Sequence, residues 1–350
     1  MKVLTVAGTR PNIIQEMLIN RLFKQRGITE VLFHSGQHYD YEMSRKFFEE
    51  FGLPDPDYHL SVSSGLPCRQ IAEIVTGTEK IILEEKPTVT LVHGDVNSTL
   101  AVALASAKLQ VPVAHIEAGL RTPFFYNPEE INRKLTDHLS ELLFPHIREA
   151  YDALMKENFS PENVFLVGDV VKDTLLWVLR RYHITPTLGD YCLATVHRYE
   201  NVESLERMTE IVDAFLESGE RIIFPVHPHT ENKLREHGLL KKLKQSKVEV
   251  IKSLEHKEFV SLMAGAKKVL TDSGGVRREA YILGKPVVIL IEIVWVESMV
   301  RCGWSKIVGT DKRRILEAIT DFRPPREHPN IFGDGKAAER IVNILCERYG

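Results

Sequence analysis

The chain has 350 residues, of which 43% are hydrophobic, and a formal net charge of −3 at pH 7. A length above the ~100–200 residues of one typical domain favours two domains, and the weak negative charge excludes a general electrostatic signature for nucleic acid or a membrane surface. The four cysteines lie far apart without zinc-like or disulfide-rich spacing, so we expect reduced thiols at Cys68, Cys192, Cys302 and Cys346.

Short apolar runs alternate with helix-period segments along the whole chain. In the first half the runs are KVLTVAGTR, EVLFHSGQH, TVTLVHGDVNS, VPVAHIEAGLR and NVFLVGD. In the second half they are YCLATVHR, RIIFPVHPHT, KVEVIKSL, KVLTDSGG and KPVVILI. Near-continuous Val, Ile and Leu strands between helices are typical of parallel sheets buried on both faces, which predicts an α/β fold.

A domain change is expected near the break TPTLGD at residues 185–190, which follows the helix-like segment VVKDTLLWVLRRY. We place the first domain at residues 1–168 and the second at 169–350, each a doubly wound parallel sheet. No apolar run approaches the ~18–20 residues of a membrane span and the first residues do not resemble a secretion signal, so we expect a cytoplasmic protein.

Ligands of doubly wound sheets bind beyond the carboxyl ends of the strands, so polar residues there are the candidates. In the first half these are Arg10, Asp95, Glu117, Glu129, Glu130 and Arg133. Carboxylates that share one crevice spread their pKa values, which suits acid and base catalysis. The alternative for Glu129 and Glu130 is a helix start after Pro128, where acids complement the helix dipole; for Glu130 we prefer this alternative.

In the second half the turn Ser273-Gly274-Gly275 opens a helix, and its bare N–H groups and positive dipole end favour an anion. The alternative is a tight turn that binds nothing. An imidazole at His197 would suit a diphosphate nearby. His227 and His229 flank a proline without a third ligand, so we expect no metal site. VAGTRPNII lacks the glycines of a dinucleotide motif, no P-loop occurs, and we expect no cofactor.

At these residues the chain resembles the non-hydrolysing UDP-N-acetylglucosamine 2-epimerase family. The shared blocks are collinear and include GTRPNII, VHGDVNSTLA, HIEAGLRT, PEEINRKLTDH, ATVHRYENVE, PVHP, DSGG, LGKPVV and WVESMVRCGWSKIVGT. The resemblance implies a GT-B type fold with a cleft between two Rossmann-like domains, a homodimer, and a last helix at about 335–350 that crosses back to the first domain. It also implies that UDP leaves C1 as a proton leaves C2, giving a 2-acetamidoglucal to which UDP adds back.

The resemblance also implies a role for each candidate. Acid and base roles fall to Asp95, Glu117 and Glu129, and UDP binding or stabilisation of the UDP leaving group falls to Arg10, His197, Ser273, Gly274, Gly275 and Glu279. Arg133 would hold a carboxylate or the diphosphate.

The chain departs from the family pattern at Gln15, at Arg277 and Arg278, and in the segment from Leu290 to Val294. Four alternatives stay open: 2-epimerisation of a related UDP-diacetamido uronic acid, a hydrolysing epimerase, a retaining glycosyltransferase, and a nucleotide-sugar-binding protein without turnover.

Overall fold

The computed structural model describes residues 1–36, 48–60, 62, 65–123, 126–292 and 296–350, without the side chains of Arg10 and Pro11. The chain forms two compact units: residues 1–174 with 331–350, and residues 175–330. The division therefore follows Thr174, a few residues after the expected boundary at Gly168. None of the described helices is long and apolar enough to cross a membrane.

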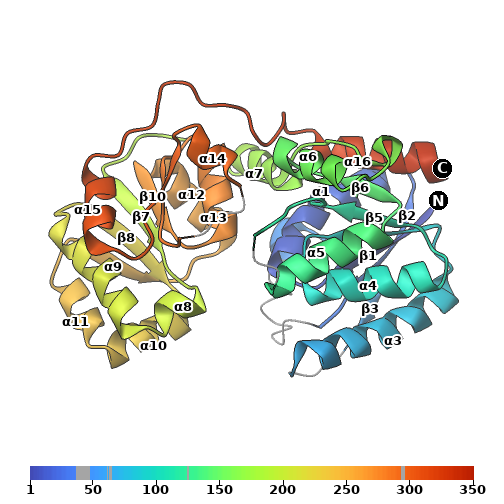
Figure 1. Cartoon of the computed structure of the whole chain (residues 1–350), viewed down its shortest axis with the longest axis horizontal. Coiled ribbons are helices and arrows are strands. Elements are labelled where there is room, and N and C mark those ends of the chain that lie inside the picture. Colours follow the sequence, from blue (N-terminus) through green and yellow to red (C-terminus); the bar gives the residue numbers. More distant parts are fainter. Residues whose placement is uncertain (37–47, 61, 63–64, 124–125, 293–295) are drawn as a thin grey trace. The chain divides into compact units, whose positions relative to one another are not determined.

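The first unit contains one parallel sheet and the helices around it (Figure 1). Its elements are β1 (Lys2–Ala7), α1 (Arg10–Gln25), β2 (Thr29–His34), β3 (Tyr58–His59), α3 (Pro67–Glu85), β4 (Val89–His93), α4 (Asn97–Lys108), β5 (Val113–Ile116), α5 (Pro128–Leu139), β6 (Leu142–Phe144), α6 (Arg148–Lys156), η1 (Pro161–Asn163), the start of α7 (Val170–Arg181), and α16 (Ala337–Tyr349). The strand order is β3-β2-β1-β4-β5-β6.

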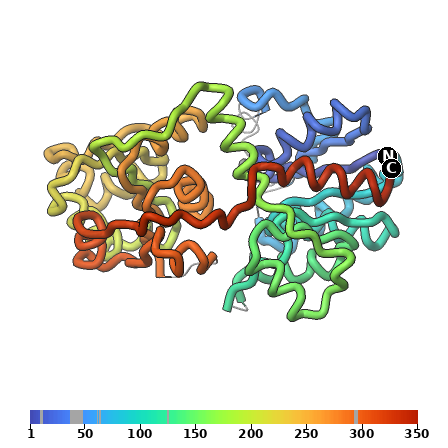
Figure 2. Tube along the Cα trace, turned by 90° about the horizontal axis from the view of Figure 1, so that it is seen from above, coloured from blue at the N-terminus to red at the C-terminus, as the bar shows by residue number. Residues whose placement is uncertain are grey.

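Both faces of this sheet are buried, as the continuous apolar runs predict. On one face Ile19 and Phe23 of α1 and Ile341 of α16 pack against Val3 and Leu91 of the strands. On the other face the apolar residues of α3 and α4 cover the sheet. Figure 2 shows both chain ends close together in this unit, where α16 contacts α1.

The second unit is built in the same way around a second parallel sheet. Its elements are β7 (Tyr191–Thr195), α8 (Tyr199–Val202), α9 (Leu205–Glu217), β8 (Arg221–Val226), α10 (Pro228–Glu236), α11 (Leu239–Lys244), β9 (Val248–Lys252), α12 (His256–Gly265), β10 (Lys268–Thr271), α13 (Gly274–Ile282), β11 (Val287–Ile289), α14 (Ser298–Arg301), β12 (Ser305–Ile307) and α15 (Lys312–Thr320). The strand order is β12-β11-β10-β7-β8-β9. Two all-parallel six-stranded sheets with surrounding helices confirm the predicted α/β class.

One predicted strand is wrong. The run NVFLVGD forms only an isolated bridge between Val164 and Leu143, and the residues after it are irregular. The short strands β3, β6 and β12 were not predicted, because two or three residues are too few to show a periodicity.

Candidate active site

The candidate residues fall into two groups, one in each unit, and both groups follow the carboxyl ends of strands. In the first unit β4 and β5 are neighbours with His93 opposite Ile116, so the segments after them lie at the same edge of the sheet. Asp95 lies in the turn between β4 and α4, and Glu117 directly follows β5. Asp95 and Glu117 therefore both follow strand ends at one edge of the sheet, and their catalytic role stays a prediction.

Glu117 has an unusual backbone conformation. Its φ angle is +67°, in the left-handed region that residues other than glycine rarely adopt. Such a conformation costs on the order of 1–3 kcal/mol, and it persists only where surrounding contacts hold it. One such contact is the hydrogen bond that the Glu117 N–H donates to the carbonyl of Phe144 at 3.1 Å. The side chain is held separately, because Gln15 Nε2 donates a 2.7 Å hydrogen bond to Glu117 Oε1.

Asp95 is paired with a buried arginine on α5. Arg133 is 3% exposed, and its Nε lies 3.2 Å from Asp95 Oδ2. The next residue back along α5 fixes the Asp95 backbone, because Asn132 Nδ2 donates to the Asp95 carbonyl at 2.9 Å. Arg133 thus holds a carboxylate, one of the two roles expected for it.

The environment of Asp95 makes its carboxyl group a weaker acid than usual. Burial raises the pKa of Asp95 to about 6, with Arg133 opposing the rise and the carboxylates of Glu117 and Glu129 adding to it. The charges of Glu117, Glu129 and Arg133 therefore all act on the Asp95 carboxyl group. A carboxyl group with a pKa near neutrality can both accept and return a proton, which is what acid–base catalysis requires.

The two neighbouring glutamates at the start of α5 differ from each other. Glu129 is exposed, and its N–H donates to the side chain of the N-cap residue Asn127 at 2.9 Å. Glu130 is 1% exposed, accepts a hydrogen bond from the Thr122 N–H at 2.9 Å, and lies 3.2 Å from the Lys134 ammonium. Glu130 lies in the first turn of α5 after Pro128, as the helix-start interpretation predicts, and it also holds Thr122 of the preceding loop.

A second, fully buried group of titratable side chains lies next to this edge. His93 Nε2 and Glu16 Oε2 are 2.7 Å apart, and neither side chain is accessible to solvent. Burial raises the pKa of Glu16 to about 8 and that of Glu30 well above its usual range. Burial lowers the pKa of His93 to about 4, against the attraction of Glu117 and Glu30. Burial therefore favours the neutral form of the His93 imidazole and the protonated form of Glu16.

In the second unit a buried carboxylate joins the β7–α8 loop to the β10–α13 turn. Asp272 accepts hydrogen bonds from the N–H groups of His197 at 3.1 Å and Arg198 at 3.0 Å, and from Asn201 Nδ2 at 3.1 Å. The His197 ring also approaches, with Nδ1 3.4 Å from Asp272 Oδ1. Sequence reasoning proposed His197 but missed Asp272 and Asn201, which position the loop that carries it.

The Ser273-Gly274-Gly275 turn begins α13 as predicted. Ser273 is the N-cap, and its Oγ accepts a hydrogen bond from the Val276 N–H at 3.4 Å. Arg277 is 4% exposed, and its Nη2 lies only 3.7 Å from the place that a Cβ on Gly274 would occupy. Burial lowers the pKa of Arg277 to about 10, with the charges of Arg198 and Arg278 adding to the effect. The turn therefore combines the N-terminal end of a helix, two bare glycines and the Arg277 guanidinium. Together these groups favour the binding of an anion.

Other candidates in the second unit have clear structural partners. Glu279 is 9% exposed, and its Oε1 lies 3.3 Å from His256 Nε2. His229 Nε2 lies 2.9 Å from the carboxylate of Glu203. Gly284 follows the C-cap of α13 with a φ angle of +68°, which confirms it as the residue that ends the helix.

Comparisons with known proteins match the chain over almost its whole length. The family model of UDP-N-acetylglucosamine 2-epimerase matches residues 20–346. A protein of Methanococcus maripaludis named as a UDP-N-acetylglucosamine 2-epimerase homolog is 42% identical over 357 residues, which cover 99% of each chain. The chain belongs to the UDP-N-acetylglucosamine 2-epimerase family.

Two further relatives carry names that give two different nucleotide sugars. The crystal structure of Methanocaldococcus jannaschii UDP-GlcNAc 2-epimerase in complex with UDP-GlcNAc and UDP matches with a TM-score of 0.89 and 38% identity, covering 99% of this chain and 100% of that one. A Pseudomonas aeruginosa protein named UDP-2,3-diacetamido-2,3-dideoxy-D-glucuronate 2-epimerase is also 38% identical, over 99% of this chain and all of its own.

The departures from the epimerase-family pattern have structural partners where the chain is described. Gln15 bonds Glu117, and Arg277 lies against the Gly274 turn. Leu290 is fully buried after β11, and its carbonyl accepts a hydrogen bond from Asn201 at 3.0 Å. Val294 and Trp295 lie outside the described residues, as does the side chain of Arg10.

Proposed function

We propose that this chain interconverts UDP-N-acetylglucosamine and UDP-N-acetylmannosamine by inverting C2 of the sugar. The observation that carries the proposal is the pair of carboxylates, Asp95 and Glu117, held at one strand edge by Arg133 and Gln15. Membership of the epimerase family, together with relatives named as 2-epimerases, supports the choice of substrate. Proton transfer at carbon needs groups of this kind, positioned and able to change protonation state near pH 7.

In the proposed reaction one carboxylate removes the C2 proton while the C1–O bond to UDP breaks. The electron pair of the C2–H bond forms the C1–C2 double bond of a 2-acetamidoglucal, and UDP leaves with the electrons of the C1–O bond. A proton is then delivered to the opposite face of C2 and UDP adds back to C1. Because two faces must be served, we assign the proton transfers to Asp95 and Glu117. The negative charge of Glu129 raises the pKa of Asp95, which makes the Asp95 carboxylate a stronger base.

UDP is assigned to groups of the second unit. The Ser273-Gly274-Gly275 turn at the start of α13 would bind the diphosphate through N–H groups and the Ser273 hydroxyl. His197 would balance the charge that develops on the leaving UDP, and Glu279 would accept hydrogen bonds from the ribose hydroxyls. Arg10 would contribute a cation from the start of α1, and Arg133 would keep Asp95 in place. No cofactor enters this chemistry.

The proposal is tested by incubating the purified protein with UDP-N-acetylglucosamine and, in parallel, with a UDP-2,3-diacetamido glucuronate. Chromatography and NMR of the products then separate the alternatives. A UDP-linked manno epimer from the first substrate supports the proposal. Free N-acetylmannosamine would indicate hydrolysis, turnover of the second substrate alone would reassign the specificity, and UDP binding with no turnover of either would contradict the enzymatic proposal.

We also propose that the enzyme acts as a cytoplasmic homodimer, as the family resemblance implies. No helix among the described residues could span a membrane, which is compatible with this location. Light scattering after size-exclusion chromatography should give twice the 39.9 kDa mass of the chain. A single-chain mass at micromolar concentration would contradict the dimer.

A further inference from the structure

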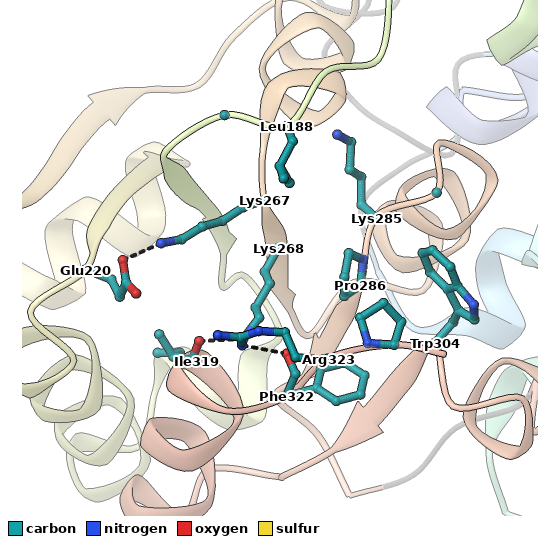
Figure 3. Close-up of a pocket in the computed structure, with 13 residues that line it drawn as sticks. Leu188, Glu220, Lys267, Lys268, Lys285, Pro286, Trp304, Ile319, Phe322 and Arg323 are labelled. Carbon is teal, nitrogen blue, oxygen red and sulfur yellow. Dashed lines mark hydrogen bonds and ion pairs between the residues drawn. The ribbon is translucent and has the colours of Figure 1, made fainter. Parts of the chain in front are cut away.

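The second unit contains a cavity of about 370 Å³ (Figure 3). It lies at the amino ends of the strands, whereas the Ser273-Gly274-Gly275 turn lies at their carboxyl ends. Its lining residues lie at the amino ends of strands: Lys268 begins β10, Pro286 precedes β11 and Trp304 precedes β12. Ser273, in contrast, follows the carboxyl end of β10. The cavity is therefore separate from the residues assigned to UDP within this unit.

Four cations and one carboxylate line this cavity, which leaves an excess of positive charge. The ammonium group of Lys267 is paired with Glu220. Lys268 Nζ donates instead to the carbonyls of Ala318 at 2.8 Å and Ile319 at 2.5 Å. Lys285 Nζ donates to the carbonyl of Thr187. Figure 3 shows the Lys267–Glu220 ion pair at the other side of the cavity.

The fourth cation, Arg323, also has backbone partners. Its Nη1 donates to the carbonyls of Thr320 at 2.7 Å and Phe322 at 3.0 Å. Lys268, Lys285 and Arg323 therefore have no carboxylate partner among the ion pairs found for the described residues. Backbone carbonyls satisfy hydrogen bonds but carry no net charge, so the excess of positive charge in the cavity remains.

Burial makes two of these charges costly. Lys268 and Lys285 are each 5% exposed. Burial lowers the pKa of Lys268 to about 8, with the charge of Arg323 adding to the effect, and burial alone lowers the pKa of Lys285. An anion in the cavity would stabilise the charged form of both lysines, since an opposite charge within a few ångströms offsets desolvation.

The remaining walls are apolar and include two aromatic side chains. Trp304 lies beside Pro286 in Figure 3, with Phe322 below them and Leu188 at the top of the view. The Trp304 indole is fixed by its Nε1–H, which donates to the Glu327 carbonyl at 2.7 Å. Apolar walls with a few polar groups, in a volume of roughly 300–1,000 Å³, are typical of small-molecule sites.

We propose that this cavity binds a small organic anion, with a phosphate monoester or carboxylate group beside Lys268, Lys285 and Arg323 and an apolar ring against Trp304 and Phe322. The simpler role of binding the last carbonyls of α15 accounts for Lys268 and for the contact of Arg323 Nη1 with Thr320. It does not account for Lys285, nor for the three cations lining the same cavity. The inference is independent of the proposed epimerase activity.

The probe is phenyl phosphate, titrated by calorimetry into protein saturated with UDP, so that the phosphate-binding turn of α13 is occupied. Wild-type protein should bind one equivalent, and neutral phenol should not displace it. Lys285→Met and Arg323→Met should each weaken binding by about tenfold or more, because each removes a charge-assisted contact. Lys241→Met, which changes an exposed lysine on α11, should leave affinity within about twofold.

Benzoate in place of phenyl phosphate distinguishes a carboxylate site from a phosphate site. Arg323 is exposed, so Arg323→Met should fold normally even where loss of the buried Lys285 unfolds the protein. Failure of both probes to bind at up to about 10 mM would overturn the proposal. Binding that is unchanged in Arg323→Met would overturn it as well.

Discussion

Gln15 and Glu117 are joined by a 2.7 Å hydrogen bond between Nε2 and Oε1, although 102 positions separate them in the chain. The bond fixes the Glu117 carboxylate without adding a positive charge beside it. A lysine at position 15, which the family pattern favours, would add that charge and lower the proton affinity of the carboxylate. In this chain the neutral amide leaves Glu117 a stronger base.

Substitution of the amide by a carboxylate should therefore shift the pH dependence of the reaction. In Gln15→Glu a second negative charge would lie beside Glu117, so the pKa of Glu117 should rise and the acid limb of the pH–rate profile should move to higher pH. Gln15→Met, which removes the hydrogen bond without adding charge, is the matched control and should lower the rate with a smaller upward shift of the acid limb than Gln15→Glu gives. An unmoved acid limb in Gln15→Glu would contradict the role of Glu117 as a base.

The raised pKa of Asp95 leads to a separate prediction for the pH dependence of kcat/KM. Burial raises its pKa to about 6, so its ionised form should be lost as pH falls through about 6, whereas an unperturbed aspartate would stay ionised to about pH 4. If ionised Asp95 removes the C2 proton, kcat/KM for UDP-N-acetylglucosamine should fall about tenfold for each pH unit below 6. Values of kcat/KM measured from pH 4.5 to 8 check this. An acid limb of the profile near pH 4 would contradict the role of Asp95 as the base.

Conservative neutralisation of each carboxylate should separate catalysis from binding. Asp95→Asn and Glu117→Gln keep the shape of the side chain but cannot accept the C2 proton, so we expect losses of roughly 10²–10⁴ in kcat. UDP affinity, measured by calorimetry, should stay within about tenfold because UDP is assigned to the second unit. Unchanged turnover in both variants would rule out these two residues as the proton-transfer groups. Loss of folding, seen by circular dichroism, would show a structural role instead.

Glu16 should make the stability of the protein depend on pH. Its pKa in the folded state is about 8, above the usual 4.5 of a glutamate, so its contribution is fully present below about pH 4.5 and is lost as pH rises through 8. Between these values the folded state holds a proton that the unfolded state has released. The free energy of unfolding should then fall by up to about 1.4 kcal/mol per pH unit from this group.

Glu16→Gln removes this titration and should flatten the decline of stability from pH 6 to pH 8 in urea unfolding. Glu347→Gln, which changes an exposed glutamate on α16, is the control and should leave the slope unchanged. Equal slopes for the wild-type protein and Glu16→Gln would mean that Glu16 is ionised in the folded state.

Asp272 should affect UDP binding through the loop that carries His197. In Asp272→Asn one acceptor oxygen becomes an N–H₂ donor that faces the N–H groups of His197 and Arg198, so their hydrogen bonds cannot all be kept. We expect a stability loss of about 1–3 kcal/mol and UDP affinity weakened by about tenfold. Asp190→Asn, at an exposed ion pair with Arg221 in the same unit, should change neither. UDP affinity that is unchanged in Asp272→Asn would show that the loop does not bind UDP.

Much of the fold could be predicted from the sequence, because strands buried on both faces leave continuous Val, Ile and Leu runs. Strands as short as Leu142–Phe144 and Ser305–Ile307 leave no such signal. NVFLVGD has the composition of a strand, yet only Val164 pairs with the sheet. Its residues are instead used in packing beside α16, where Val167 is buried.

The site was predictable where a polar residue directly follows an apolar strand, as Asp95 and Glu117 do. Residues that act through distant partners were not. Glu16 looks like one charge on an amphipathic helix, and only the approach of His93 from β4 shows that it is buried. Glu130 and Asp272 likewise acquire their roles from loops that the sequence does not place.

NMR of UDP-N-acetylglucosamine incubated with the enzyme in D₂O shows directly whether the C2 proton is exchanged. We predict deuterium at C2 of both the recovered substrate and a UDP-linked manno epimer, because the C2 proton is exchanged on every turnover. It also predicts that Glu117→Gln abolishes this exchange while UDP still binds. Formation of the epimer with the original proton retained at C2 would contradict proton transfer by these carboxylates, and no exchange with wild-type enzyme would contradict the proposed activity.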